Sequence, residues 1–144
     1  MDRRISLITL GVDDLARARA FYAALGWRGQ EAEETVFVQA GPMALVLWDR
    51  GKLAADSGIP DRGSGFDGVV LAQNVRSGAE VDAIVAAAAE AGATVTRAPS
   101  PTFYGGYAGV FLDPDGHAWE IAFNPGFTLD DDGALVLPEF VPES

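Results

Sequence analysis

The sequence predicts an α+β fold made of two tandem units that share one order of secondary structure. Its 144 residues are enough for one domain with a real core or for two small fused modules. In each half a strand is followed by a helix that ends at a glycine, Gly26 or Gly92, and then by further strands. Neither small sheet can easily bury both faces alone, so the second faces are expected to meet or to enclose a cavity.

The first half is predicted to hold three strands and one helix. Residues 5–12 are mostly apolar and predict a strand, and Asp13 and Asp14 offer a cap for the helix that follows. Apolar side chains recur at helical spacing up to Gly26: Leu15, Ala18, Phe21, Tyr22 and Leu25. Residues 34–40 alternate and residues 43–48 are apolar, so two further strands are predicted there.

The second half repeats this order after a polar stretch. Residues 49–65 are rich in glycine and charge, which predicts a linker or a long excursion. A strand over 68–75 leads to Ser77, a helix cap with Glu80 three residues later, and then to strands over 94–97, 107–112 and 118–123. One domain over 1–144 is expected, with module one at about 5–49, a linker at about 50–66, module two at about 67–125 and a tail at about 126–144.

Composition narrows the classes of partner. The formal net charge of −11 argues against binding to nucleic acid or to anionic membranes, and it would concentrate cationic small molecules. The same charge is also explained by solubility without any cationic ligand, and the sequence leaves both explanations open. The chain has no cysteine, no apolar run long enough to span a bilayer and no signal-peptide pattern, which together favour the cytoplasm.

The most informative segment is a turn followed by a strand with one carboxylate. Asp113-Pro114-Asp115-Gly116 has proline and glycine where a turn wants them, and Glu120 follows between Trp119 and Ile121. Glu120 is either a buried acid with a raised pKa, able to act as a general acid or base, or a half-exposed and inert group.

With this segment the chain resembles the vicinal oxygen chelate superfamily of glyoxalases, bleomycin-resistance proteins and dioxygenases. The matching stretches are residues 8–15, Phe21-Tyr22, residues 25–27, residues 113–117 and Trp119-Glu120. The resemblance implies paired βαβββ modules that form a cupped mixed sheet around a pocket. It also implies a homodimer in many members, and a divalent metal held from the first and last strands of each module.

When the metal-ligand positions of that family are matched to this sequence one at a time, most of them fall on residues without a side-chain ligand atom. They fall on Leu7, near Val46, near Gly68 (with Asp67 and Val69 as neighbours) and on Glu120. Leucine and valine supply no ligand atom, and divalent metals want several nitrogen or oxygen ligands. The only histidine, His117, lies three residues from Glu120 and so points to the other face of a regular strand. No metal site and no cofactor are therefore expected, although a weakly bound divalent metal stays open.

The remaining pocket is predicted to bind a small molecule. Strand parity turns Thr9 and Glu120 toward the inner sheet surface, and aromatic side chains are candidates for its mouth. The proposed ligand-binding residues are Thr9, Trp48, Phe103, Tyr104, Tyr107 and Glu120, although residues such as Trp48 and Tyr107 more often belong to a core than to a ligand site. Glu120 is also the candidate catalytic residue.

Two functions follow from this reading. The first is a metal-independent protein that sequesters a hydrophobic or cationic compound, as bleomycin-resistance relatives do. The alternative is a glyoxalase-like lyase or isomerase that uses Glu120 as general base or as a remaining metal ligand. The sequence has one histidine and no glycine-rich phosphate loop of the right form, so it supports neither serine–histidine–aspartate nor phosphate-loop chemistry.

Overall fold

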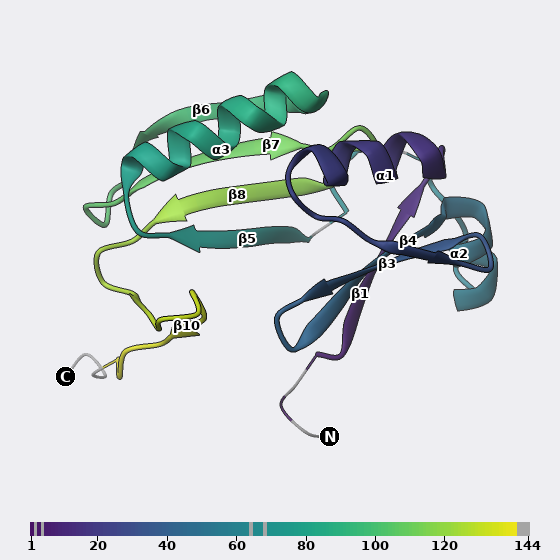
Figure 1. Cartoon of the computed structure of the whole chain (residues 1–144), viewed down its shortest axis with the longest axis horizontal. Helices are drawn as coiled ribbons and strands as arrows, with labels where there is room; N and C mark the ends of the chain where they lie inside the picture. Colours follow the sequence, from purple (N-terminus) through teal and green to yellow (C-terminus); the bar gives the residue numbers. More distant parts are fainter. Residues whose placement is uncertain (2, 4, 64, 68, 141–144) are drawn as a thin grey trace.

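The chain folds into two four-stranded sheets that are each covered on one face by a helix (Figure 1). The computed structural model describes residues 1, 3, 5–63, 65–67 and 69–140. The first sheet has the order β1 (Leu7–Val12), β4 (Met43–Asp49), β3 (Thr35–Ala40), β2 (Gln30–Ala32), and the second the order β5 (Val70–Val75), β8 (Ala118–Phe123), β7 (Tyr107–Leu112), β6 (Thr94–Pro101). The first strand of each unit runs parallel to the last and the others pair antiparallel, so the predicted α+β class and tandem repeat are confirmed.

The two main helices begin and end where the sequence predicts. In α1 (Leu15–Ala24) the Asp14 side chain accepts a hydrogen bond from the Arg17 backbone nitrogen at 3.0 Å. In α3 (Gly78–Ala91) the Ser77 side chain accepts one from the Glu80 backbone nitrogen at 3.2 Å. Each cap satisfies a backbone donor that has no partner inside the helix. Gly92 ends α3 with φ of 114°, a conformation that other residues rarely adopt.

Three elements differ from the sequence predictions. The linker predicted over 50–66 begins with a helix, α2 (Arg50–Ser57), which Asp49 caps by accepting from the Lys52 backbone nitrogen at 2.8 Å. The short strand β2 forms a hairpin with β3, and β6 extends beyond residue 97 to Pro101 with irregular pairing. Prolines are tolerated in β6 because it is an edge strand.

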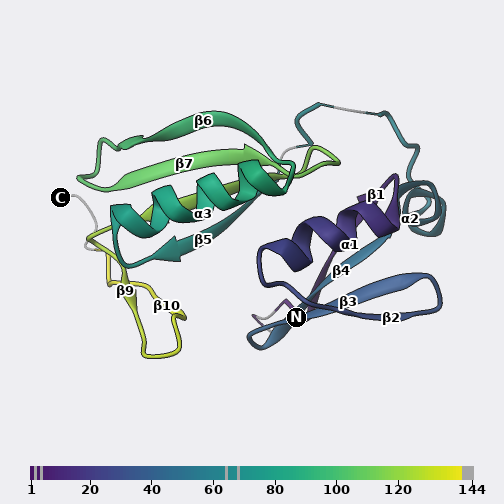
Figure 2. The same ribbon diagram turned by 45° about the horizontal axis from the view of Figure 1, so that its top comes forward.

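The helix-facing sides of both sheets share one core. Leu10, Val12, Trp119 and Ile121 are buried there with residues from α1 and α3. Aromatic rings join the two halves, since the Trp27 and Trp119 ring centroids lie 5.5 Å apart in an edge-to-face arrangement. Figure 2 shows α1 beside the second unit, where this shared core forms.

The opposite faces of the sheets remain partly open. Leu7 is 51% exposed, Phe37 41% and Val70 48%, although these apolar side chains stand in regular strands. Beyond β8 the tail forms a two-stranded hairpin of β9 (Thr128–Leu129) and β10 (Leu135–Val136), on the side of the second sheet away from α3 (Figure 1). No helix among the described residues is long and apolar enough to cross a membrane.

Candidate ligand-binding site between the two modules

An open cavity of about 970 Å³ lies between the two modules. Its walls come from the edge strands β1 and β5, from α2 and the segment after it, and from the turn between β7 and β8. The apolar side chains that line it are Ile8, Leu10, Leu53, Ala54, Ile59, Pro60, Phe66, Val69, Leu71, Leu112 and Ala118. Its size and its mostly apolar lining are typical of small-molecule sites.

One arginine joins the start of α2 to the segment that follows the helix. Arg50 Nε donates to Asp61 Oδ1 at 3.0 Å and Nη2 donates to the Gly63 carbonyl at 2.5 Å. The hydrogen bond from the Gly63 backbone nitrogen and then the Arg50 guanidinium lower the pKa of Asp61. A Cβ on Gly11 would lie 3.1 Å from the Arg50 Cα, so glycine in β1 allows α2 to come this close.

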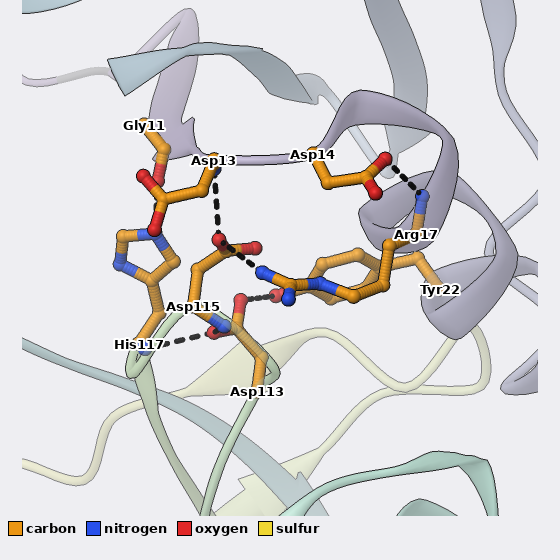
Figure 3. A network of polar contacts seen from close by, with 8 residues as sticks. All are labelled: Gly11, Asp13, Asp14, Arg17, Tyr22, Asp113, Asp115 and His117. Atoms are coloured by element: carbon orange, nitrogen blue, oxygen red, sulfur yellow. Dashed lines mark hydrogen bonds and ion pairs between the residues drawn. The ribbon is translucent and has the colours of Figure 1, made fainter. Parts of the chain in front are cut away.

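The turn of residues 113–116 joins the second module to the first (Figure 3). Asp115 Oδ1 accepts from the Asp13 backbone nitrogen at 2.9 Å and from Arg17 Nη2 at 3.0 Å. The buried Asp113 Oδ2 accepts from the Tyr22 hydroxyl at 2.7 Å. We call Asp13, Arg17, Tyr22, Asp113, Asp115 and His117 the intermodule clasp, since each makes a hydrogen bond that links the two modules.

Tyr22 is the centre of the buried part of the clasp. Its hydroxyl donates to Asp113 and accepts from Trp119 Nε1 at 3.1 Å. Burial, and after it the negative charge of Asp113, raises the pKa of Tyr22 well above its usual range. Tyr22 therefore keeps its proton, and the hydrogen bond to Asp113 stays oriented.

The single histidine completes the clasp and also lines the cavity. His117 Nε2 lies 2.7 Å from the Gly11 carbonyl oxygen, while its backbone nitrogen donates to Asp113 Oδ1 at 2.8 Å. Strand parity predicts only that this residue does not share a face with Glu120. The structure adds the contact with Gly11 and a place among the residues that line the cavity.

Of the predicted ligand-binding residues, Thr9 lines the cavity and the others lie elsewhere. Trp48 pairs with Gly11 across β1 and β4 and is partly buried, but it is not among the residues that line the cavity. The aromatic residues of the 103–107 segment lie at the opposite end of β7 from the turn, so they do not surround the mouth of this cavity (Figure 1). Phe103 is fully exposed, whereas the Tyr107 hydroxyl donates to Asp82 of α3 at 2.8 Å.

Glu120 lies on the open face of the second sheet, as strand parity predicts. Its side chain is 36% exposed and its Oε2 lies 3.2 Å from Arg97 Nη2 of β6. The carboxylate thus has a cation beside it and is not an isolated buried acid. Its role in binding or catalysis stays a prediction.

The side chains at the family's metal-ligand positions do not fit a metal site. Leu7 and Val46 offer hydrocarbon, Glu120 is already ion-paired, and Gly68 lies outside the described residues. Across the described residues, His, Cys, Asp and Glu side chains form no group of three or more that could hold a metal ion. No chemical step is therefore assigned to a metal here.

Sequence reasoning missed the linker's contribution to the site. Residues 50–67 supply Arg50, Leu53 and Phe66 to the cavity wall, although the segment reads as polar and glycine-rich. The available signal was the recurrence of large apolar residues, Leu53, Ile59 and Phe66, inside that polar stretch. Isolated apolar residues in a linker indicate that it packs on something.

Comparisons with known proteins agree with this architecture. The family model of the Glyoxalase/Bleomycin resistance protein/Dioxygenase superfamily matches residues 4–121. The chain is similar to a glyoxalase-related enzyme from Fulvimarina pelagi, with 33% identity, a TM-score of 0.85 and coverage of 95% of this chain and 99% of that one.

Other solved structures share the fold at lower identity. A lactoylglutathione lyase from Agrobacterium tumefaciens is 25% identical with a TM-score of 0.63, over 85% of this chain and 94% of that one. A family enzyme from Burkholderia phytofirmans PsJN is 23% identical with a TM-score of 0.73, over 82% and 96%. No curated protein matches the chain significantly. The matching family model and the tandem sheets together show that this chain belongs to the glyoxalase/bleomycin resistance protein/dioxygenase superfamily.

Proposed function

We propose that the protein binds a largely hydrophobic small molecule in the intermodule cavity and needs no metal to do so. The observation that carries the proposal is the cavity itself, with apolar side chains from β1, β5, α2 and the linker around one open space. Burying apolar ligand surface there supplies about 25 cal/mol for each Å² removed from water. Exposed Ile59, Phe66 and Val69 at the cavity are further apolar surface for a ligand to cover.

A neutral fluorescent probe, N-phenyl-1-naphthylamine, tests the binding site. We expect saturable binding with one site per chain, and we expect Ala54→Trp to reduce affinity at least about tenfold because the indole occupies the cavity. Ala87→Trp is the matched control, since Ala87 is exposed on α3 and does not line the cavity. Absence of binding to the wild type, or equal binding to Ala54→Trp, would reject the site.

Metal independence has its own test. Elemental analysis of protein purified without chelator should find well under one transition metal per chain, and probe binding should be unchanged after dialysis against a chelator. One tightly bound metal per chain would overturn this part of the proposal.

Binding of a cationic ligand on the open face of the second sheet is a separate form of this function, since Glu120 is not among the residues that line the cavity. It is supported by the net charge of −11 and by the carboxylate of Glu120 on the open sheet face. Because Arg97 already lies 3.2 Å from that carboxylate, a cationic ligand must displace the arginine to use it. Glu120→Gln should weaken a cationic dye but leave the neutral probe unaffected, and equal affinity for the dye would remove Glu120 from the site.

A lyase or isomerase activity is the second candidate. It is supported by Glu120, the one family ligand position that carries a donor, and by the similarity to a lactoylglutathione lyase. An assay for lactoylglutathione formation, with and without added divalent metal, tests it directly. Activity that disappears in Glu120→Gln would favour this function over simple binding.

We also propose a homodimer that covers the open sheet faces. The accessible surface is 9574 Å², whereas a folded monomer of 15.1 kDa is expected to expose about 7,100 Å². This excess is larger than the ~800 Å² that a standard interface buries on each partner, so the open faces offer enough surface for one. Sedimentation equilibrium at micromolar concentration should give twice the chain mass.

A cytoplasmic location is likewise proposed from the cysteine-free composition.

A further inference from the structure

We infer that His117 selects the ligand, because its Nδ1 atom accepts a hydrogen bond from a hydroxyl or N–H group of the bound molecule. The inference rests on the proposed function, since it takes the intermodule cavity as the binding site. It adds a ligand class: a mostly apolar molecule that carries a hydrogen-bond donor. Two features of the ring determine this role: its tautomer, and the groups around its second nitrogen.

The Gly11 carbonyl determines which ring nitrogen carries the proton. Nε2 lies 2.7 Å from that carbonyl oxygen, within hydrogen-bond distance. A carbonyl oxygen only accepts, so the proton of this hydrogen bond belongs to Nε2. In the neutral imidazole the other nitrogen, Nδ1, then presents a lone pair and can only accept.

Nδ1 is accessible and has no partner among the described residues. No hydrogen bond from another described group reaches it, and the one buried side-chain polar atom without a partner in that part of the chain is Asp115 Oδ2. Nδ1 is therefore in contact with solvent, and the His117 side chain lines the cavity. Figure 3 shows this nitrogen on the side of the ring away from Asp113 and Asp115.

The carboxylates of the cavity wall are paired or hydrated, since Asp61 pairs with Arg50 and Asp67 is exposed at the mouth. The hydroxyls of Thr9 and Ser57 also line the wall, but a hydroxyl can donate or accept and so sets no requirement on the ligand. Nδ1 of the neutral ring can only accept. It therefore favours a ligand that donates, because an unsatisfied polar atom is costly once water is displaced.

Protonation of the ring should abolish this selectivity. The imidazolium carries a proton on Nδ1, which then repels a donor and attracts an acceptor. The ionisable groups around the ring, from every element packed near it, are Asp13, Arg17, Asp113 and Asp115 of the clasp and Arg50, Asp61, Arg62 and Asp67 of the cavity wall. The protonation state of the ring must therefore be followed directly rather than assumed from the pH.

The single histidine makes a direct measurement possible. In full-length protein labelled with ¹⁵N-histidine, both ring nitrogen signals belong to His117. We expect Nε2 at the position of a protonated nitrogen and Nδ1 at that of an unprotonated one. Addition of 2-naphthol should shift the Nδ1 signal in the direction of hydrogen bonding, whereas 2-methoxynaphthalene, which has the same rings and no donor, should not. A protonated Nδ1 with a bare Nε2 in the neutral protein would overturn the inference.

Affinities of the same two probes give a second readout. The ratio of their dissociation constants should favour 2-naphthol about fivefold more in the wild type than in His117→Phe, which has a ring but no acceptor. It should also fall when the pH is lowered until the ring signals show protonation. Arg17→Met is the control, since it breaks the ion pair of the clasp while the ring remains; its ratio should equal that of the wild type.

The outcomes separate this inference from the proposed function. If neither probe binds the wild type, the binding site itself is wrong. If both bind, while the Nδ1 signal does not shift and the ratio is the same in His117→Phe, the cavity binds ligands but His117 does not select them. Should His117→Phe fail to fold, the ring signals of the wild type decide the question alone.

Discussion

The buried hydroxyl of Tyr22 gives the sharpest test of how the two modules are held together. Tyr22→Phe removes one oxygen and leaves the ring, so packing against Phe21 and Trp119 is retained. The hydroxyl makes two hydrogen bonds, donating to Asp113 at 2.7 Å and accepting from Trp119 Nε1 at 3.1 Å. Both partners are buried, at 3% and 8% exposure, so water does not readily replace the lost oxygen.

The expected magnitude follows from these two contacts. A hydrogen bond to a charged group contributes about 1.5–3 kcal/mol, and a buried donor left without an acceptor costs about 1–3 kcal/mol. Taking values near the lower ends, we expect Tyr22→Phe to lower the free energy of unfolding by about 3 kcal/mol. The melting temperature should fall by about 10 °C, since the unfolding entropy of a chain this size is roughly 0.3 kcal/mol per kelvin.

Urea unfolding, followed by both far-ultraviolet circular dichroism and tryptophan fluorescence, measures this change. Tyr107→Phe is a matched control, because its hydroxyl donates to Asp82 at a similar 2.8 Å in a solvent-accessible position. The control should lose under about 0.5 kcal/mol, because water replaces the missing partner. A loss below about 1 kcal/mol in Tyr22→Phe, or equal losses in the two variants, would refute the view that the buried part of the clasp stabilises the fold.

Three further predictions concern pH, backbone packing and helix capping. The folded state raises the pKa of Tyr22, so the contribution of this residue to stability is complete below the unfolded pKa near 10 and is lost as the pH rises above it. Above about pH 10 the free energy of unfolding of the wild type should fall by about 1.4 kcal/mol per pH unit more than that of Tyr22→Phe. Urea unfolding at several alkaline pH values measures this difference. Gly106→Ala should destabilise by more than about 2 kcal/mol, since its Cβ would lie 2.2 Å from the Phe123 carbonyl oxygen, and a thermal melt unchanged from wild type would contradict that packing. Ser77→Ala should cost about 1 kcal/mol through loss of the α3 cap, and Ser77→Asp, which retains an acceptor, should restore most of it in the same assay.

Local signals were sufficient to predict the repeated elements of the fold. The caps at Asp14 and Ser77 and the stop at Gly92 are determined within a few residues of chain, and the structure confirms all three. The alternation in β1 and β8 likewise reports which side chains face the core, since Leu10 and Trp119 are buried while Thr9 and Glu120 are partly exposed. Elements whose conformation is set by short-range interactions are the ones a single sequence describes well.

Helix α2 shows where short-range signals fail. Gly51 in its first turn and the polar residues around it favour a loop by intrinsic propensity. Its contacts in the fold are instead with residues distant in sequence, as Lys52 pairs with Glu34 at 2.7 Å and Arg50 packs over Gly11. The β2–β3 turn is similar, because Glu33 and Glu34 adopt positive φ where asparagine and glycine are usual.

The candidate site was predicted only in part, because strand parity gives the face of a side chain but not its position along the sheet. Parity turns Glu120 away from the core, but it does not show that Arg97 of β6 lies beside the carboxylate, across β7. The aromatic segment at 103–107 follows β6 and ends at the first residue of β7, so it lies about a strand length from the 113–116 turn. Nothing in the residue order shows that separation until the register of β6, β7 and β8 is known.

The repeated modules and the linker contribute different residues to the cavity, and this difference bears on which part of the chain determines ligand specificity. The turn of residues 113–116, which marks the family, is used mainly to join the modules, through Asp113 to Tyr22 and through Asp115 to Arg17. Roughly half of the residues that line the cavity belong instead to positions 50–67, a segment that has no counterpart in the second module. Under the proposed function, roughly half of the positions that could alter ligand specificity therefore lie in the linker, outside the sheets and the clasp. His117 belongs to both parts, since it joins the modules through its contact with Gly11 and also lines the cavity.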